Sequence, residues 1–237
     1  MIDSAPLITL RRLFGALVVF STLRFISNGW IDCQIVDPLL TFPFEGFEWL
    51  PRPNRLGAYL LFAGMLIGGV SIMTGKIYKT GCFVFFICFT YVELLDKSNY
   101  LNHYYFVSLI SFILFFLPAH KPGFQIHSYL LLTCKLLVVM VYFFAGLAKL
   151  NGDWLYHAQP LTLWLPQHSD FPLLGSLFQY RETAYVFSWF GAIFDLATPF
   201  ALFSNNTRKY FYPLLVCFHI LTWMLFPIGI FPWVMIA

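Results

Sequence analysis

Long apolar stretches, each followed by a short cluster of polar residues, succeed one another along the chain. They do not alternate between polar and apolar positions, as the ~10-residue strands of a membrane β-barrel do. A helix needs about 20 apolar residues to cross the hydrocarbon core of a bilayer. The pattern therefore predicts an all-α fold, a polytopic membrane helix bundle with about seven transmembrane helices, or eight if the apolar tail at 228–237 begins another. The predicted spans are 7–26, 56–73, 77–95, 102–117, 126–150, 183–203 and 210–226.

Composition supports a membrane protein and argues against several other classes. Of the 237 residues, 59% are hydrophobic and 11% are charged, whereas roughly a quarter of the residues of a soluble domain are charged. The net charge of +3 is small and scattered, so no nucleic acid partner is expected. The five cysteines show no CxxC spacing, so no metal site is expected. We predict a single transmembrane domain over 1–237, with the lipid bilayer as its main partner.

Basic residues in the short loops predict an orientation, because lysine and arginine collect on the cytoplasmic side of a membrane. With a cytoplasmic N-terminus, all the basic loops fall on one face, and the long loops 27–55 and 151–182 fall on the other. We therefore predict a multi-pass integral membrane protein whose N-terminus is cytoplasmic. The basic residues concerned are Arg11, Arg12, Lys76, Lys79, Lys121, Arg208 and Lys209.

Two polar clusters stand out from the apolar background, at 95–103 and 145–154. The predicted orientation places both on the non-cytoplasmic face. The stretches LDKSNYLNHYY (95–105), VYFFAGLAKLNGDW (141–154) and FHILTWMLFPIGIFPWVM (218–235) resemble, in this order, the vitamin K-dependent γ-glutamyl carboxylases. The resemblance extends to the wider group of proteins that share their horizontally transferred transmembrane (HTTM) domain.

This resemblance implies a site and a chemistry. Lys149 stands where the family has the base that deprotonates reduced vitamin K (the hydroquinone). Oxygen and carbon dioxide are the co-substrates: the oxygenated quinone becomes a strong base that removes a glutamate γ-proton, and carbon dioxide adds to the carbanion. Asn102 and His103 would then hydrogen-bond Lys149 or the quinone oxygens. A glutamate-containing peptide is the implied substrate, no metal is implied, and the activity is that of a carbon–carbon lyase with quinone epoxidase activity.

The physical chemistry of Lys149 allows both this role and a simpler one. The preceding residues 141–148 carry no charge, and burial disfavours the charged form of a lysine, so a neutral amine could accept a phenolic proton. A lysine at a helix end is more often an interfacial anchor whose stem lies in the bilayer. For Asn102 the simpler interpretation is a helix N-cap, since asparagine is a preferred cap.

Three further titratable residues lie deep inside predicted spans. Counting ~1.5 Å per residue along each helix places Lys135, Asp195 and His219 in one layer of the membrane. Charges at such depth are costly unless they are paired. We therefore predict a Lys135–Asp195 ion pair with His219 nearby, and a proton relay through the same residues is the functional alternative.

The family also sets a limit on the functional prediction. Its enzymes carry a substantial extracytoplasmic portion after the membrane domain, and this chain stops at Ala237 in an apolar segment. An extracytoplasmic C-terminal domain is therefore expected to be absent. The leading prediction is a carboxylase-like membrane enzyme with its active site on the non-cytoplasmic face. The alternative is a non-carboxylating membrane module that binds a quinone or lipid, or a structural membrane protein.

Overall fold

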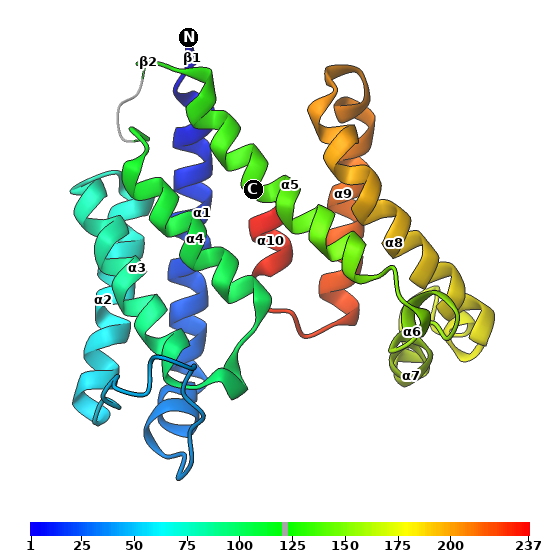
Figure 1. Cartoon of the computed structure of the whole chain (residues 1–237), viewed down its shortest axis with the longest axis horizontal. Helices are drawn as coiled ribbons and strands as arrows, with labels where there is room; N and C mark the ends of the chain where they lie inside the picture. Colours follow the sequence, from blue (N-terminus) through cyan, green and yellow to red (C-terminus); the bar gives the residue numbers. More distant parts are fainter. Residues whose placement is uncertain (120–122) are drawn as a thin grey trace. The chain divides into compact units, whose positions relative to one another are not determined.

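The computed structural model describes residues 1–119 and 123–237, and Lys121 lies outside the described residues. Nearly all regular structure among these residues is helical (Figure 1), so the all-α prediction is confirmed. Strands β1 (Ile2–Asp3) and β2 (Gln125–Ile126) form a short antiparallel pair. The long helices are α1 (Ala5–Ser27), α2 (Arg55–Thr74), α3 (Tyr78–Leu95), α4 (Asn102–Phe116), α5 (Ser128–Ala148), α8 (Arg181–Phe203) and α9 (Asn205–Leu225). The short elements are η1 (Asp32–Val36), η2 (Lys97–Asn99), α6 (Gly152–Leu155), α7 (Leu161–Trp164), η3 (Leu165–His168), η4 (Leu177–Gln179) and α10 (Phe231–Ile236).

Each predicted span coincides with one of the long helices, with small differences at the ends. Five of these helices, namely α1, α2, α3, α5 and α8, are long and apolar enough to cross a membrane. Helix α4 is apolar but has 15 residues, and α9 begins with the polar residues 205–209. The chain is thus a multi-pass membrane protein, while the number seven and the orientation stay predictions.

The chain folds into two compact units. The first contains residues 1–134 and 229–235, and the second contains residues 135–228. In the first unit α1 packs against α2, α2 against α3, and α3 against α4 (Figure 1). Helices α2 and α3 approach each other closely at Gly68, where an added Cβ would lie 2.8 Å from the carbonyl oxygen of Gly81. Only glycine allows this approach.

Arg11 of α1 links three parts of the first unit. Its guanidinium donates hydrogen bonds to the carbonyl oxygens of Ile72 and, at 2.9 Å, Met73, both in the last turn of α2. Its Nε donates to the carbonyl oxygen of Ala119 at 3.0 Å. The last carbonyls of a helix have no partner inside the helix. Arg11, which is 3% exposed, therefore caps α2 from a neighbouring helix.

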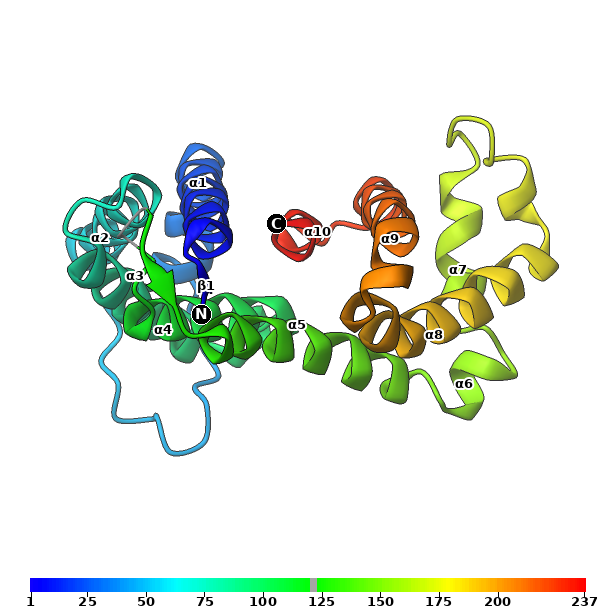
Figure 2. The ribbon, with the colours of Figure 1, turned by 90° about the horizontal axis from the view of Figure 1, so that it is seen from above.

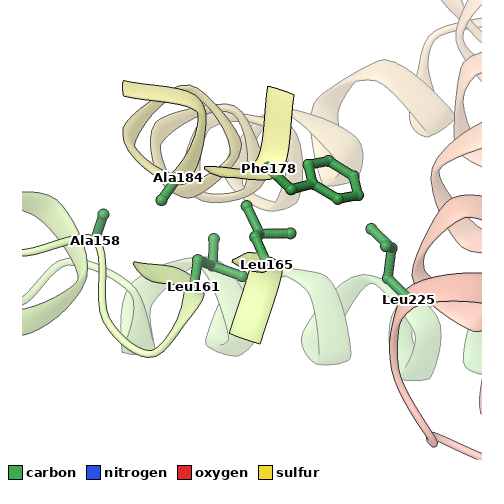
Figure 3. Packing of buried hydrophobic residues seen from close by; sticks show 6 residues of the cluster. All are labelled: Ala158, Leu161, Leu165, Phe178, Ala184 and Leu225. Carbon is green, nitrogen blue, oxygen red and sulfur yellow. The ribbon is translucent and has the colours of Figure 1, made fainter. Parts of the chain in front are cut away.

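In the second unit, α8 packs against α9 and against the short helices α6 and α7 (Figure 2). The segment 151–182, which the sequence analysis treats as a loop, thus contains short helices packed on a membrane helix. Four of its side chains, Ala158, Leu161, Leu165 and Phe178, form a buried cluster with Ala184 of α8 and Leu225 of α9 (Figure 3). This packing fixes the segment that follows Lys149.

Candidate functional site

Lys149, which follows the last residue of α5, forms an ion pair with Asp195 of α8. Its Nζ lies 2.6 Å from Asp195 Oδ2 and also donates to the carbonyl oxygen of Ala145 at 3.3 Å. The carboxylate side chain is 6% exposed and the lysine side chain 21%. A buried carboxylate needs a charged or hydrogen-bonding partner, and here the residue predicted to be the base supplies it.

Two glycines allow Lys149 to reach Asp195. A Cβ at Gly146 would lie 2.7 Å from Leu196 Cγ and 2.9 Å from the Leu196 backbone nitrogen, so α5 and α8 are in close contact here. On α8, a Cβ at Gly191 would come 4.0 Å from Lys149 Cε and 3.7 Å from the indole of Trp154. The lysine side chain thus passes over α8 at Gly191, which has no side chain, and reaches Asp195.

Trp154 covers the ammonium group of Lys149, with its ring centroid 5.1 Å from Nζ. Its indole Nε1 donates to the carbonyl oxygen of Ser188 at 2.7 Å, and the Ser188 hydroxyl donates to the Trp154 carbonyl at 2.5 Å. Asn151 caps α6 by accepting a hydrogen bond from the Trp154 backbone at 2.9 Å. Residues 151–154 are therefore fixed on α8, and the indole shields the ion pair.

The predicted Lys135–Asp195 pair is wrong. Asp195 binds Lys149 instead, and Lys135 is an exposed residue of α5. Equal depth in the membrane brings two residues together only where their helices run side by side. Helices α5 and α8 instead approach each other closely at Gly146 and Leu196. The carboxyl end of α5 thus meets the middle of α8.

His219, the third residue predicted for this layer, binds another partner. Its Nε2 lies 2.5 Å from the hydroxyl of Tyr142, and both side chains are buried. This contact joins α5 to α9. Tyr142 was not singled out in the sequence, because a tyrosine within an apolar run resembles any other aromatic core residue. Its burial beside a histidine of another helix is visible only in the fold.

Asn102 and His103 belong to the first unit and Lys149 to the second. The prediction that these three residues share one site stays a prediction. Asn102 is exposed and is the first helical residue of α4. The N-cap position is occupied by Leu101, so the interpretation of Asn102 as an N-cap is wrong. The His103 ring lies 5.4 Å from the ring of Phe231, and its Nε2 is buried without a hydrogen-bond partner among the described residues.

Asp96, in the first polar cluster, has a role that the sequence analysis missed. Its carboxylate accepts hydrogen bonds from the backbone amides of Ser98 at 2.9 Å and Phe42 at 3.2 Å. Burial opposes ionisation of Asp96, but these two amides, together with the Ser98 side chain and the charge of Arg52, outweigh it and hold the pKa of Asp96 below its usual value. Asp96 therefore fixes the long loop that contains Phe42 to the turn before α4.

A cavity of about 490 Å³ lies between α3 and α4 in the first unit. This volume falls within the range of roughly 300–1,000 Å³ that is typical of small-molecule sites. Thr90 donates a hydrogen bond to Ser108 at 3.2 Å in its lining, and the Glu93 side chain lines it as well. The other lining residues are apolar or aromatic, namely Phe44, Phe86, Leu94, Tyr100, Tyr105, Leu109 and Phe112.

The helices and the buried ion pair define a multi-pass α-helical membrane protein with titratable side chains inside its apolar core. The model of the HTTM domain family matches residues 1–237, so the chain belongs to the HTTM family, whose domain is found in vitamin K-dependent carboxylase-like proteins. The resemblance seen in the sequence is thereby confirmed at the level of the family. No solved structure matches the chain.

Proposed function

We propose that the chain is a γ-glutamyl carboxylase-like membrane enzyme, in which Lys149 and Asp195 act together on a reduced quinone. The observation that carries the proposal is the ion pair itself, at 2.6 Å and largely shielded from solvent. Such a pair in a membrane domain is costly to maintain, and intramembrane ionisable residues mark functional sites more often than structural ones. The family supplies the reaction class, which couples quinone epoxidation to glutamate γ-carboxylation.

Reduced vitamin K is the cofactor that this family implies, and the residues of the chain fit it. A hydroquinone needs an apolar pocket for its ring and a group that accepts a phenolic proton. Within the second unit, the Lys149–Asp195 pair is a suitable acceptor, and the indole of Trp154, whose centroid is 5.1 Å from Lys149 Nζ, offers an aromatic face beside it. With oxygen, the bound hydroquinone would supply the strong base that removes a glutamate γ-proton, which prepares the γ-carbon for carbon dioxide.

Asp195 would prepare Lys149 for its role. An ammonium group cannot accept a proton, so Lys149 must first lose one, and Asp195 Oδ2 lies within hydrogen-bonding distance of Nζ. Transfer of that proton gives a neutral amine beside a neutral carboxylic acid. A low-dielectric surrounding makes this neutral state less costly than it is in water, because it penalises both charges of the ion pair. Asp195 is thus a positioning residue for the base, and Trp154 limits the access of water.

The test compares epoxide formation from reduced vitamin K in membranes that contain the native chain, Lys149→Ala or Lys149→Arg. We expect both variants to lose about 100-fold or more of the rate, because a positioned general base contributes roughly 10²–10⁴-fold. Arginine keeps the charge opposite Asp195 but does not lose its proton. Lys135→Ala is the matched control, since it removes an exposed lysine from the same helix. Equal rates for the native chain and Lys149→Arg would overturn the proposal.

A second candidate function is a membrane module that binds a quinone or lipid without turnover. The aromatic cavity favours this candidate independently of Lys149, because it lies in the other unit. The distinguishing measurement is binding of menaquinone to the purified chain together with epoxidation by the same sample. Saturable binding without epoxide in the native chain would favour the module.

A further inference from the structure

Arg24, in the last turn of α1, has no counter-ion among the described residues. Its Nε is buried and makes no hydrogen bond within this part of the chain. Its guanidinium lies over the ring of Trp30, with the central carbon 5.0 Å from the ring centroid. A stacked indole offsets only part of the cost of burying a cation. Arg24 is half-buried, and its Nε is a donor without a partner that is shielded from solvent.

His103 lies close to this guanidinium, on α4. Its Nε2 is also buried without a hydrogen-bond partner in the described residues. The two side chains meet beside Gly229, which has a positive φ of 61°. A Cβ built on Gly229 would lie 3.6 Å from Arg24 Nη2 and 4.0 Å from His103 Nε2. Two polar groups without partners, on different helices, thus converge at a residue that lacks a side chain.

Buried polar groups are almost always hydrogen-bonded, and buried cations are almost always paired. Two exceptions at one place indicate a ligand that completes them. The ligand must accept hydrogen bonds and carry negative charge, because a guanidinium has only donors. Flat aromatic rings border the site, Trp30 against Arg24 and Phe231 against His103.

We propose that Arg24 and His103 bind a carboxylate group beside Gly229. The planar fork of a guanidinium matches the two oxygens of a carboxylate, and His103 Nε2 is placed to donate a further hydrogen bond when that nitrogen carries the proton. The site lies wholly in the first unit and does not depend on Lys149. The carboxylate belongs either to an acidic side chain of a peptide or to a small free acid. If the carboxylase proposal holds, a glutamate side chain is the natural occupant.

The test is isothermal titration calorimetry with the purified full chain in lipid nanodiscs. The probes are a blocked peptide with one glutamate, the same peptide with glutamine, propionate, and inorganic phosphate. We expect the glutamate peptide to bind and the glutamine peptide not to bind. Propionate distinguishes the two sources, because tight binding of propionate alone indicates a free acid and tight binding of the peptide indicates a side chain. Binding of phosphate but of neither carboxylate would overturn the proposal.

Variants connect the binding to the two side chains. Arg24→Gln should weaken carboxylate binding about 10- to 100-fold, the loss expected for hydrogen bonds to a charged group. Arg24→Lys should restore part of it, and His103→Gln should weaken it less. Arg12→Gln, an exposed arginine on the same helix, is the matched control and should bind normally. Unchanged affinity in Arg24→Gln and His103→Gln would overturn the proposal, and if Arg24→Gln does not fold, His103→Gln and Arg24→Lys decide.

Failure of this proposal can be told apart from failure of the carboxylase proposal. Binding is measured without turnover, and Lys149→Arg should bind the carboxylate as the native chain does. An inactive chain that still binds through Arg24 leaves the site intact and removes only the enzyme. An enzymatically active chain that binds the carboxylate equally well without Arg24 would overturn the binding site and leave the carboxylase proposal intact.

Discussion

Lys149 in the second unit and Arg24 in the first are both cations at the ends of apolar helices, and they differ in what neutralises them. The Lys149 ammonium lies 2.6 Å from a carboxylate of the same unit. The Arg24 guanidinium has an aromatic ring and no acid within the described residues. One unit therefore provides its own anion, and the other leaves its donors open beside a glycine.

This difference separates two uses of a buried charge. A cation that is paired within the protein can exchange a proton with its partner, and it is held in place when no ligand is bound. A cation that the fold leaves unpaired costs stability until an anion arrives, and that cost makes it selective for anions. This difference is the basis of both proposals, proton transfer by the pair in the second unit and ligand recognition by Arg24 and His103.

The largest effect is expected from removal of the acid in the paired site. Asp195→Asn leaves the Lys149 ammonium shielded and uncompensated, and breaking a buried pair in this way costs about 3–5 kcal/mol. The free energy of unfolding in detergent measures this loss. The double variant Asp195→Asn with Lys149→Met should recover most of it, because the orphaned charge is then gone. A double variant no more stable than Asp195→Asn alone would contradict the assignment of Asp195 as the counter-ion.

The sequence predicts the helices well and their contacts poorly, for physical reasons. Apolar runs such as 56–73 define a helix because a membrane span needs a minimum length, so α2 was found nearly at its true ends. The partner of Asp195 was missed because depth along a helix says nothing of where two helices cross. That crossing depends on Gly146 against Leu196, a contact between residues far apart in the sequence.

Candidate site residues show the same limit. Lys149 could be predicted as a site residue from a family motif. Arg24 could not, because the evidence for its role is the absence of a hydrogen-bond partner for its Nε among the described residues. An arginine near the end of a membrane helix commonly extends toward the interface, and the sequence gives no sign that this one is buried at Nε. The convergence with His103 needs both side chains to lie beside Gly229, far away in the sequence, which no local pattern predicts.

A comparison of two arginines on α1 sharpens the distinction between partnered and unpartnered cations. Arg11→Met removes the donors that three backbone carbonyls use, and each buried group left unsatisfied costs about 1–3 kcal/mol. We expect a total loss of about 3 kcal/mol or more. Arg24→Met removes no hydrogen bond among the described residues; it forfeits the contact with Trp30, worth about 0.5–1 kcal/mol, and relieves the cost of an unpaired cation, so the net loss is smaller than that. Thermal unfolding of both variants in one detergent measures the difference, and equal losses would show that Arg24 has structural partners.

The smallest expected effect concerns Asp96, whose carboxylate, unlike that of Asp195, accepts hydrogen bonds from two backbone amides. Because those amides lower the pKa of Asp96 in the folded state, the folded chain binds this proton less readily than the unfolded chain does. The resulting stabilisation is fully present above the unfolded pKa of about 3.9 and is lost as the pH falls through the lower folded value. Native protein should therefore lose stability below about pH 4 more steeply than Asp96→Asn, which cannot titrate at this position. Urea unfolding between about pH 3 and pH 6 measures the two slopes, and parallel slopes would show that the amides of Ser98 and Phe42 do not stabilise the charged form.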